Sequence, residues 1–153
     1  MEAIKRILVV SRMTQLCQKA LKQGISLARK YDAELFVIHV VHNPFGLAGW
    51  NLPGLSLKKD YEKLLKDAKD ELDKIIRKEK GTDLDIKVLI QEGEPIAQIL
   101  KTVKEKEIDL MVLLAHEEGR LEHFLFGREN ETLYRRLPCS LLLVKKEPEA
   151  VSW

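Results

Sequence analysis

The residues with the clearest capacity for chemistry lie in a polar segment that follows the apolar run Leu110–Ala115. His116 and His123, with Glu117 and Glu118 between them, are side-chain types that can bind a divalent metal. Their spacing is not that of H-E-x-x-H, which places two histidines on one face of a helix. We therefore expect no metal site in this segment.

Three arginines indicate a different chemistry. Arg12, Arg120 and Arg128 follow or flank predicted strands, and guanidinium groups bind phosphate oxygens in a bidentate manner. The simpler interpretation is three solvated surface side chains, the usual state of charged residues. Ser11 and Thr14 could extend an anion site, but Thr14 is also explained as a helix N-cap, which stabilises a helix by about 1 kcal/mol.

No constellation of catalytic residues is found at the predicted strand ends. The sequence shows neither a nucleophile with a neighbouring base nor a carboxylate pair, so we expect a protein that is not an enzyme. Cys17 and Cys139 lack the number and spacing of a disulfide scaffold or a zinc site, which favours reduced thiols. The longest apolar run has six residues where a membrane span needs about 20. We predict a cytoplasmic protein without a membrane anchor.

Length and composition indicate one globular domain. The chain has 153 residues, of which 45% are hydrophobic and 33% charged, and its formal net charge is +2. This charge does not favour nucleic acid as a partner. We expect the domain to cover residues 1–147 and a short tail to cover residues 148–153.

Buried strands alternate with amphipathic helices along the chain. The patterns predict strands over residues 4–10, 33–41, 84–90, 108–115 and 139–146. They predict helices over residues 14–31, 61–76, 96–103 and 129–136, with Gly81 as a left-handed cap after the second helix. This alternation indicates an α/β fold with an open five-stranded parallel sheet and helices on both faces. Ligands of such folds bind at the carboxyl ends of the strands.

The segments "KRILVV", "AELFVIHVV", "GEPIAQIL", "EIDLMVLL", the spaced Gly127 and "LPCSLLLV" resemble the universal stress protein family over essentially the whole chain. The resemblance implies the strand order 3-2-1-4-5, a homodimer paired through the last strand, here Cys139–Lys146, and no catalytic activity as a class. Many members of the family bind ATP, and others do not.

ATP-binding members carry the pattern G-x2-G-x9-G-S/T after the fourth strand. Counted back from Gly127, its first two glycines fall on Leu114 and Glu117, and its Ser or Thr falls on Arg128. An acidic residue that faces adenosine in binding members falls on Arg12. The pocket positions implied by the resemblance are Val10, Ser11, Arg12, Val40, Leu114, His116, Glu117, Gly127, Arg128 and Glu129.

The resemblance and its departures lead to two alternative functions. The first is a non-enzymatic binding or regulatory protein of the stress response, with a degenerate nucleotide motif and with an unidentified protein partner in addition to its own second copy. The second is an ATP- or AMP-binding switch with at most slow ATP hydrolysis. The expected ligand class is ATP or another phosphate-bearing anion. The loop that carries Phe45 and Trp50 could cover the pocket, contact a partner or pack on the sheet.

Two other doubly wound families fit the sequence less well. A phosphoacceptor receiver domain needs acidic residues after the first strand and an aspartate at the end of the third, where this chain has "VVSRM" and "LIQEG". A flavin-binding loop needs several Ser, Thr and Gly residues after the first strand, where this chain has "SRMTQL".

Overall fold

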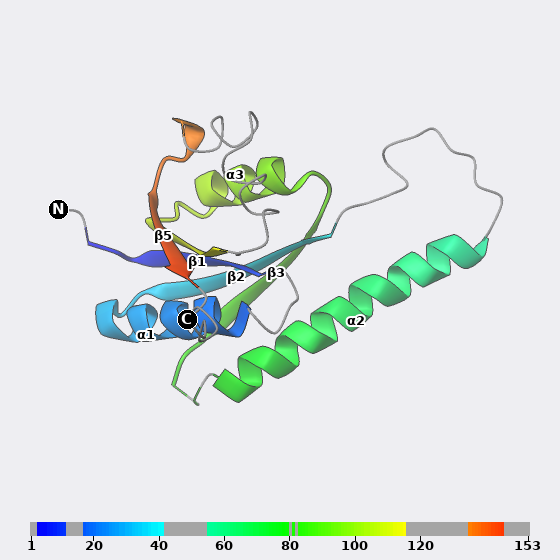
Figure 1. Cartoon of the computed structure of the whole chain (residues 1–153), viewed down its shortest axis with the longest axis horizontal. Helices are drawn as coiled ribbons and strands as arrows, with labels where there is room; N and C mark the ends of the chain where they lie inside the picture. The colour runs from blue at the N-terminus through cyan, green and yellow to red at the C-terminus, as the bar shows by residue number, and fades with distance from the viewer. Residues whose placement is uncertain are drawn as a thin grey trace, which may run out of the picture.

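A five-stranded parallel sheet forms the centre of the protein (Figure 1). The computed structural model describes residues 3–11, 17–41, 55–79, 81, 83–115 and 135–145. The strands lie in the order β3-β2-β1-β4-β5, which confirms the predicted fold class and strand order. Their bounds are β1 Arg6–Ser11, β2 Glu34–Val41, β3 Ile86–Glu92, β4 Leu110–Ala115 and β5 Ser140–Lys145.

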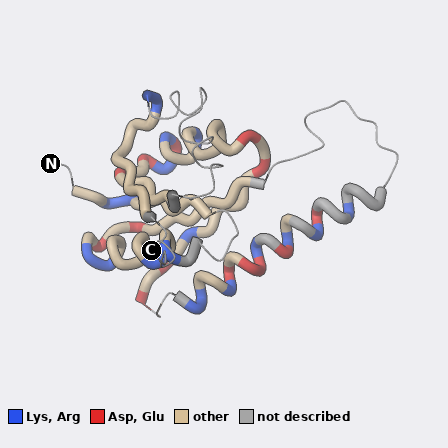
Figure 2. The backbone as a smooth tube through the Cα atoms, in the orientation of Figure 1, with Lys and Arg blue, Asp and Glu red and all other residues tan. Residues whose placement is uncertain are grey.

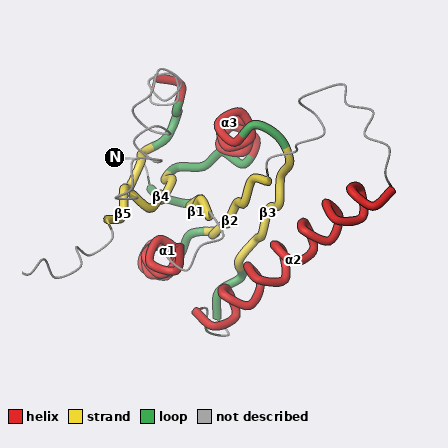
Figure 3. The backbone as a smooth tube through the Cα atoms, turned by 45° about the vertical axis from the view of Figure 1, so that its right-hand side comes forward, coloured by secondary structure: helices red, strands yellow, loops and turns green. Residues whose placement is uncertain are grey.

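Helices cover both faces of this sheet, as right-handed crossovers between parallel strands require. In the described part of the chain they are α1 Cys17–Tyr31, α2 Leu55–Glu79 and α3 Pro95–Glu105. Figure 3 shows α1 and α2 on one face and α3 on the other. The first turns of α2 extend past the edge of the sheet in Figure 1. None of the helices in the described ranges combines the length and the apolar character that crossing a membrane requires.

Alternating side chains of the strands supply two separate hydrophobic layers. Ile7 and Val9 of β1 point toward α1 and α2, whereas Leu8 and Val10 point toward α3. All four are at most 5% exposed, because a central parallel strand is covered on both faces. The continuous apolar runs that predicted the strands are the consequence of this double coverage.

Several predicted boundaries shift in the structure. α2 begins at Leu55, six residues before Tyr61, where the prediction placed the start of the second helix. The prediction started the helix at its first clear apolar repeat, but helix ends commonly extend beyond the amphipathic stretch. Thr14 lies outside the described residues, and of the predicted helix 129–136 only Arg135 and Arg136 are described, in helical conformation.

Gly81 is not the left-handed cap that the sequence suggested. The described residues with a positive φ angle are Asp32, Gly93 and Glu107. A Cβ atom on Gly81 would lie 2.9 Å from Asp83 Oδ1 and 3.1 Å from Arg29 Nη2, the two partners of an ion pair of 3.1 Å. The glycine therefore allows the close approach of α1 and the segment before β3.

Gly24 allows a closer contact, between α1 and the sheet. A Cβ atom there would lie 2.4 Å from Cγ2 of Val9, a stiff β-branched side chain that is 1% exposed. We expect Gly24→Ala to lower the free energy of unfolding by about 1–2 kcal/mol, because overpacking outweighs the helix propensity gained. Urea denaturation measures the change. The exposed Ser26→Ala in the same helix should instead stabilise slightly, and equal effects of the two substitutions would contradict the overpacking argument.

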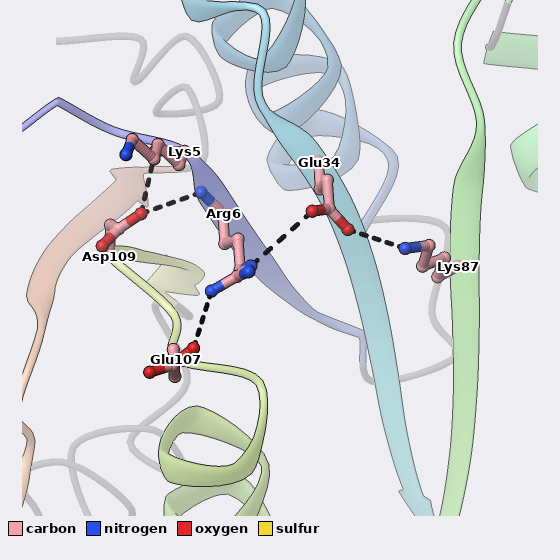
Figure 4. A network of polar contacts seen from close by, with 6 residues as sticks. All are labelled: Lys5, Arg6, Glu34, Lys87, Glu107 and Asp109. Atoms are coloured by element: carbon pink, nitrogen blue, oxygen red, sulfur yellow. Dashed lines mark hydrogen bonds and ion pairs between the residues drawn. The ribbon is translucent and has the colours of Figure 1, made fainter.

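The amino ends of four strands are connected by a polar network, which Figure 4 shows. Arg6 Nη1 donates to Glu107 Oε2 at 3.0 Å, and Arg6 Nε lies 3.6 Å from Glu34 Oε1. Lys87 Nζ donates to the other Glu34 oxygen at 2.6 Å, and this hydrogen bond is the main cause of the lowered pKa of Glu34. These side chains are exposed, so each ion pair contributes little to stability.

Asp109 makes the contacts of this network that bear on stability. Its Oδ2 accepts hydrogen bonds from the main-chain N–H groups of Lys5 at 2.8 Å and Arg6 at 2.9 Å. We expect Asp109→Ala to destabilise the fold by about 1–3 kcal/mol, because two donors lose a charged acceptor. Thermal or urea unfolding measures the loss. Asp85→Ala, at an exposed position, is the matched control and should change stability by less than about 0.5 kcal/mol.

Candidate functional site

The strand order reverses between β1 and β4, and the carboxyl ends of these strands form the candidate ligand site. Ligands of open α/β sheets bind in the crevice outside such a point. Ser11 is the last residue of β1 and is paired in register with His39 of β2. Leu114 and Ala115 end β4, where Leu114 is paired with Val144 of β5. Parallel pairing brings these strand ends together along the carboxyl edge of the sheet, which is distinct from its lateral edges at β3 and β5.

Four of the ten predicted pocket positions lie at this edge: Val10, Ser11, Val40 and Leu114. Val10 and Val40 pack in the hydrophobic layer on the α3 side, where Val10 is 5% exposed and Val40 is partly buried. Ser11 is 6% exposed. The described part of the edge is therefore an apolar wall of two valines beside a buried serine.

The other six predicted positions lie outside the described residues. They are Arg12, His116, Glu117, Gly127, Arg128 and Glu129. The same holds for Arg120, for the second histidine of the polar segment and for the loop that carries Phe45 and Trp50. The structure thus brings together the predicted site residues that lie at strand ends. The predicted site residues in the loops stay predictions.

His39 is a residue of this edge that the sequence analysis did not select. Its Nδ1 lies 3.0 Å from the main-chain oxygen of Ser11. Since a carbonyl oxygen only accepts, Nδ1 carries the proton and Nε2 is the acceptor of the neutral ring. Burial lowers the pKa of His39, against the opposing effect of this hydrogen bond. The signal in the sequence was a single polar residue inside the apolar run of β2.

The lowered pKa of His39 predicts a pH dependence of stability. The folded protein binds the proton less well than the unfolded chain, so this contribution is complete above the usual pKa of about 6.5 and is lost as the pH falls below it. We expect the wild type to lose more stability than His39→Gln between pH 7.5 and pH 5.5. Urea titrations of both proteins at the two pH values measure the difference. An equal loss in the two proteins would show that His39 does not contribute.

The Ser11–His39 pair does not form a nucleophile with its base through Nδ1. That nitrogen is bonded to the main-chain oxygen of Ser11 and is not available to accept a proton from a hydroxyl. In the described ranges, no group of three or more His, Cys, Asp or Glu side chains is arranged to hold a metal ion. The described edge therefore presents the apolar side chains of Val10 and Val40 beside the side chains of Ser11 and His39.

The amino end of α3 could have supplied an anion site, but it is capped by the chain itself. The Glu94 carboxylate accepts from the N–H of Ile96 at 3.2 Å and of Ala97 at 2.7 Å, and Pro95 begins the helix. A carboxylate at this position satisfies the free N–H groups and interacts favourably with the helix dipole. A phosphate bound in the crevice would therefore depend on the loops after β1 and β4 and not on α3.

Comparison with known proteins agrees with this fold. The family model described as "Universal stress protein family" matches residues 3–145. Universal stress protein MJ0531 of Methanocaldococcus jannaschii is 30% identical over 147 residues, covering 93% of this chain and 82% of the relative. The solved structure of MJ0577, from the same organism, superposes with a TM-score of 0.72 at 20% identity and covers 97% of this chain and 100% of that one. The chain belongs to the universal stress protein family.

At least two solved members of the family carry a nucleotide. One is a universal stress protein in complex with cAMP. Another is a universal stress protein family protein from Arabidopsis thaliana with AMP bound. Its TM-score is 0.55 at 15% identity, over 95% of this chain and 94% of that one, so the likeness is one of fold.

Proposed function

We propose that this protein is a non-enzymatic binding or regulatory member of its family, acting in the stress response in the cytoplasm as one domain over residues 1–147. The observation that carries the proposal is the described edge of the site: two valines, a buried serine and a histidine whose Nδ1 is bonded to a main-chain oxygen. Such an edge can contact a ligand, but its described residues supply no pair of groups that would perform acid–base or nucleophilic chemistry.

The departures from the family motif support weak binding of ATP at this edge. Leu114 and Glu117 replace glycines that let main-chain N–H groups approach phosphates, and Arg128 replaces the residue that starts the next helix. Arg12 and Arg128 retain affinity for phosphate oxygens. The proposed ligand is a phosphate-bearing anion held without strong selection for adenosine.

The nucleotide content of the purified protein tests this proposal. We expect mass spectrometry of denatured, unsupplemented protein to find no stoichiometric ATP or AMP. Calorimetry should then give weak and similar affinities for ATP, AMP and inorganic pyrophosphate. Stoichiometric ATP or AMP in the preparation would overturn the proposal.

A second candidate is a nucleotide-dependent switch with at most slow ATP hydrolysis. The AMP-bound family structure supports it, because it shows that this fold can hold an adenine nucleotide. Val10 and Val40 would then contact the base, as apolar side chains do in most nucleotide pockets. A preference for AMP or ATP over pyrophosphate of more than about tenfold would favour this candidate.

We further propose a homodimer paired through β5. β5 lies at the edge of the sheet beside β4, and Leu143 on it is 39% exposed. An edge strand with apolar side chains and unpaired main-chain groups is a site of association. Antiparallel pairing of β5 with its copy about a two-fold axis would satisfy those groups through one self-complementary patch.

A further inference from the structure

A cavity of about 520 Å³ lies at the opposite end of the sheet from the candidate ligand site. Three segments line it: residues 3–4 before β1, residues 108–109 before β4 and residues 137–140 before β5. In Figure 1 the start of β1 and the segment that leads into β5 both lie in the left part of the view, at the end of the sheet where these strands begin. The cavity is thus next to the strand that we propose as the dimer interface.

Apolar side chains form much of the lining of this cavity, beside Asp109 and Ser140. Five of its eight lining residues are Ala3, Ile4, Ile108, Leu137 and Pro138. The carboxylate oxygen Oδ2 of Asp109 is already held by two main-chain N–H groups. Burial raises the pKa of the Cys139 thiol to about 11, so the sulfur is neutral and behaves as a small apolar group.

The two-fold pairing of β5 directs a specific segment into this cavity. The N–H of Ser140 faces β4, so Leu141, Leu143 and Lys145 face the free edge and must be opposed by residues that also face it. If Ser140–Lys145 pairs antiparallel with its copy about Leu143, Lys145 of one chain lies opposite Leu141 of the other. Ser140 lines the cavity, and the residues beyond it in the direction of the partner strand are Cys139, Pro138 and Leu137. The eight residues after Lys145 can extend about 26 Å, more than enough to reach these side chains.

The charges of the two surfaces are complementary. The basic residues Lys5 and Arg136 directly adjoin the lining segments in the sequence, and Arg135 precedes Arg136. Figure 2 shows basic positions at both places, at the start of β1 and before β5. The segment after Lys145 carries Glu147 and Glu149, followed by the apolar residues Ala150, Val151 and Trp153. In the register about Leu143, Glu149 of one chain comes opposite Leu137 of the other, next to Arg136.

We propose that residues 146–153 of each chain bind in the cavity at the amino end of β5 of the partner chain, with their apolar residues inside and their glutamates at the basic rim. The inference rests on the proposed homodimer and extends it, because each copy completes the hydrophobic surface of the other. The reciprocal exchange adds apolar contact to the strand pairing at both ends of the interface.

Disulfide trapping in the full-length chain tests this exchange. The background Cys17→Ser with Cys139→Ser removes both natural thiols, and Ala3→Cys with Val151→Cys places one thiol at the exposed cavity wall and one in the segment. After oxidation with diamide, we expect more than half of the chains to migrate as a covalent dimer on a non-reducing gel. The matched single variants Ala3→Cys and Val151→Cys should remain mostly monomeric on the gel.

The outcomes separate this proposal from the dimer itself. Light scattering on the same reduced samples gives the oligomeric state independently of the trap. A dimer in solution whose chains form only an intrachain disulfide would show that each segment folds back on its own cavity, and a dimer without any cross-link would leave the cavity to another ligand. Either result overturns the exchange and keeps the dimer, whereas a monomer in light scattering overturns both.

Tryptophan fluorescence gives a second readout that needs no cysteine. The sequence contains two tryptophans, so Trp50→Phe leaves Trp153 as the sole reporter. We expect its emission to be blue-shifted and protected from acrylamide, and Leu137→Asp in the cavity wall should reverse both effects without dissociating the dimer. Emission of a solvated tryptophan in the dimeric protein would overturn the proposal.

Discussion

ATP affinity should increase by about 30-fold or more when Leu114→Gly, Glu117→Gly, Arg128→Ser and Arg12→Asp are combined. If Glu117 has to adopt a left-handed conformation, the native side chain costs about 1–2 kcal/mol. Its carboxylate repels a polyphosphate by about 1–4 kcal/mol at a dielectric typical of protein surfaces. Removing both penalties corresponds to a factor of roughly 30 to 10⁴ in affinity. The substitutions at Arg128 and Arg12 would restore the polar anchors of the family motif.

Calorimetry with ATP measures the gain, and a matched variant separates its two causes. Glu117→Gln in place of Glu117→Gly, with the other three substitutions kept, removes the charge but not the conformational penalty. Its ATP affinity should lie between those of the wild type and the full variant. Equal ATP affinity of the wild type and the full variant would mean that these four positions do not control the pocket.

The sequence was sufficient for the strands because central parallel strands are buried on both faces. β1 and β2 read as largely apolar runs, and residues Ile7 to Val10 are indeed at most 5% exposed. Strand order is a different matter, since periodicity says which residues are buried but not which strands are neighbours. The order 3-2-1-4-5 came from the resemblance to a family, and the structure confirms it.

The details that sequence analysis missed depend on contacts between distant segments. The role of Gly81 follows from an ion pair between Arg29 and Asp83, which are 54 residues apart. His39 becomes notable only when β1 and β2 are paired and its ring reaches the main chain of Ser11. At the candidate site, the strand-end positions could be predicted from the topology rule, whereas the loop positions after β1 and β4 rest on the motif alone.

A proline at Leu143 should abolish the proposed dimer and leave the fold intact. The N–H of Ser140 donates to Asp109 O at 3.2 Å, on the β4 side of β5. Because N–H directions alternate along a strand, those of Leu142 and Val144 also face β4, whereas those of Leu141 and Leu143 face the free edge. Leu143→Pro removes an edge donor in both chains and places a proline ring against the partner strand. Two lost ladder bonds correspond to about 1–3 kcal/mol, an increase of roughly 5- to 150-fold in the dimer dissociation constant, to which the clash of the proline ring adds.

Leu142→Pro is the matched control, one residue away on the same strand. Leu142 is paired with Val112 of β4 and packs against the hydrophobic layer on the α1 side, so a proline there breaks the sheet itself. We expect Leu142→Pro to unfold or aggregate and Leu143→Pro to be a folded monomer with the circular dichroism spectrum of the wild type. Light scattering and sedimentation across tens of micromolar protein give the oligomeric state. A wild type that is monomeric in this range, or a Leu143→Pro variant that remains a dimer, would show that β5 is not the association surface, and the exposed Leu143 would then have to be covered in another way.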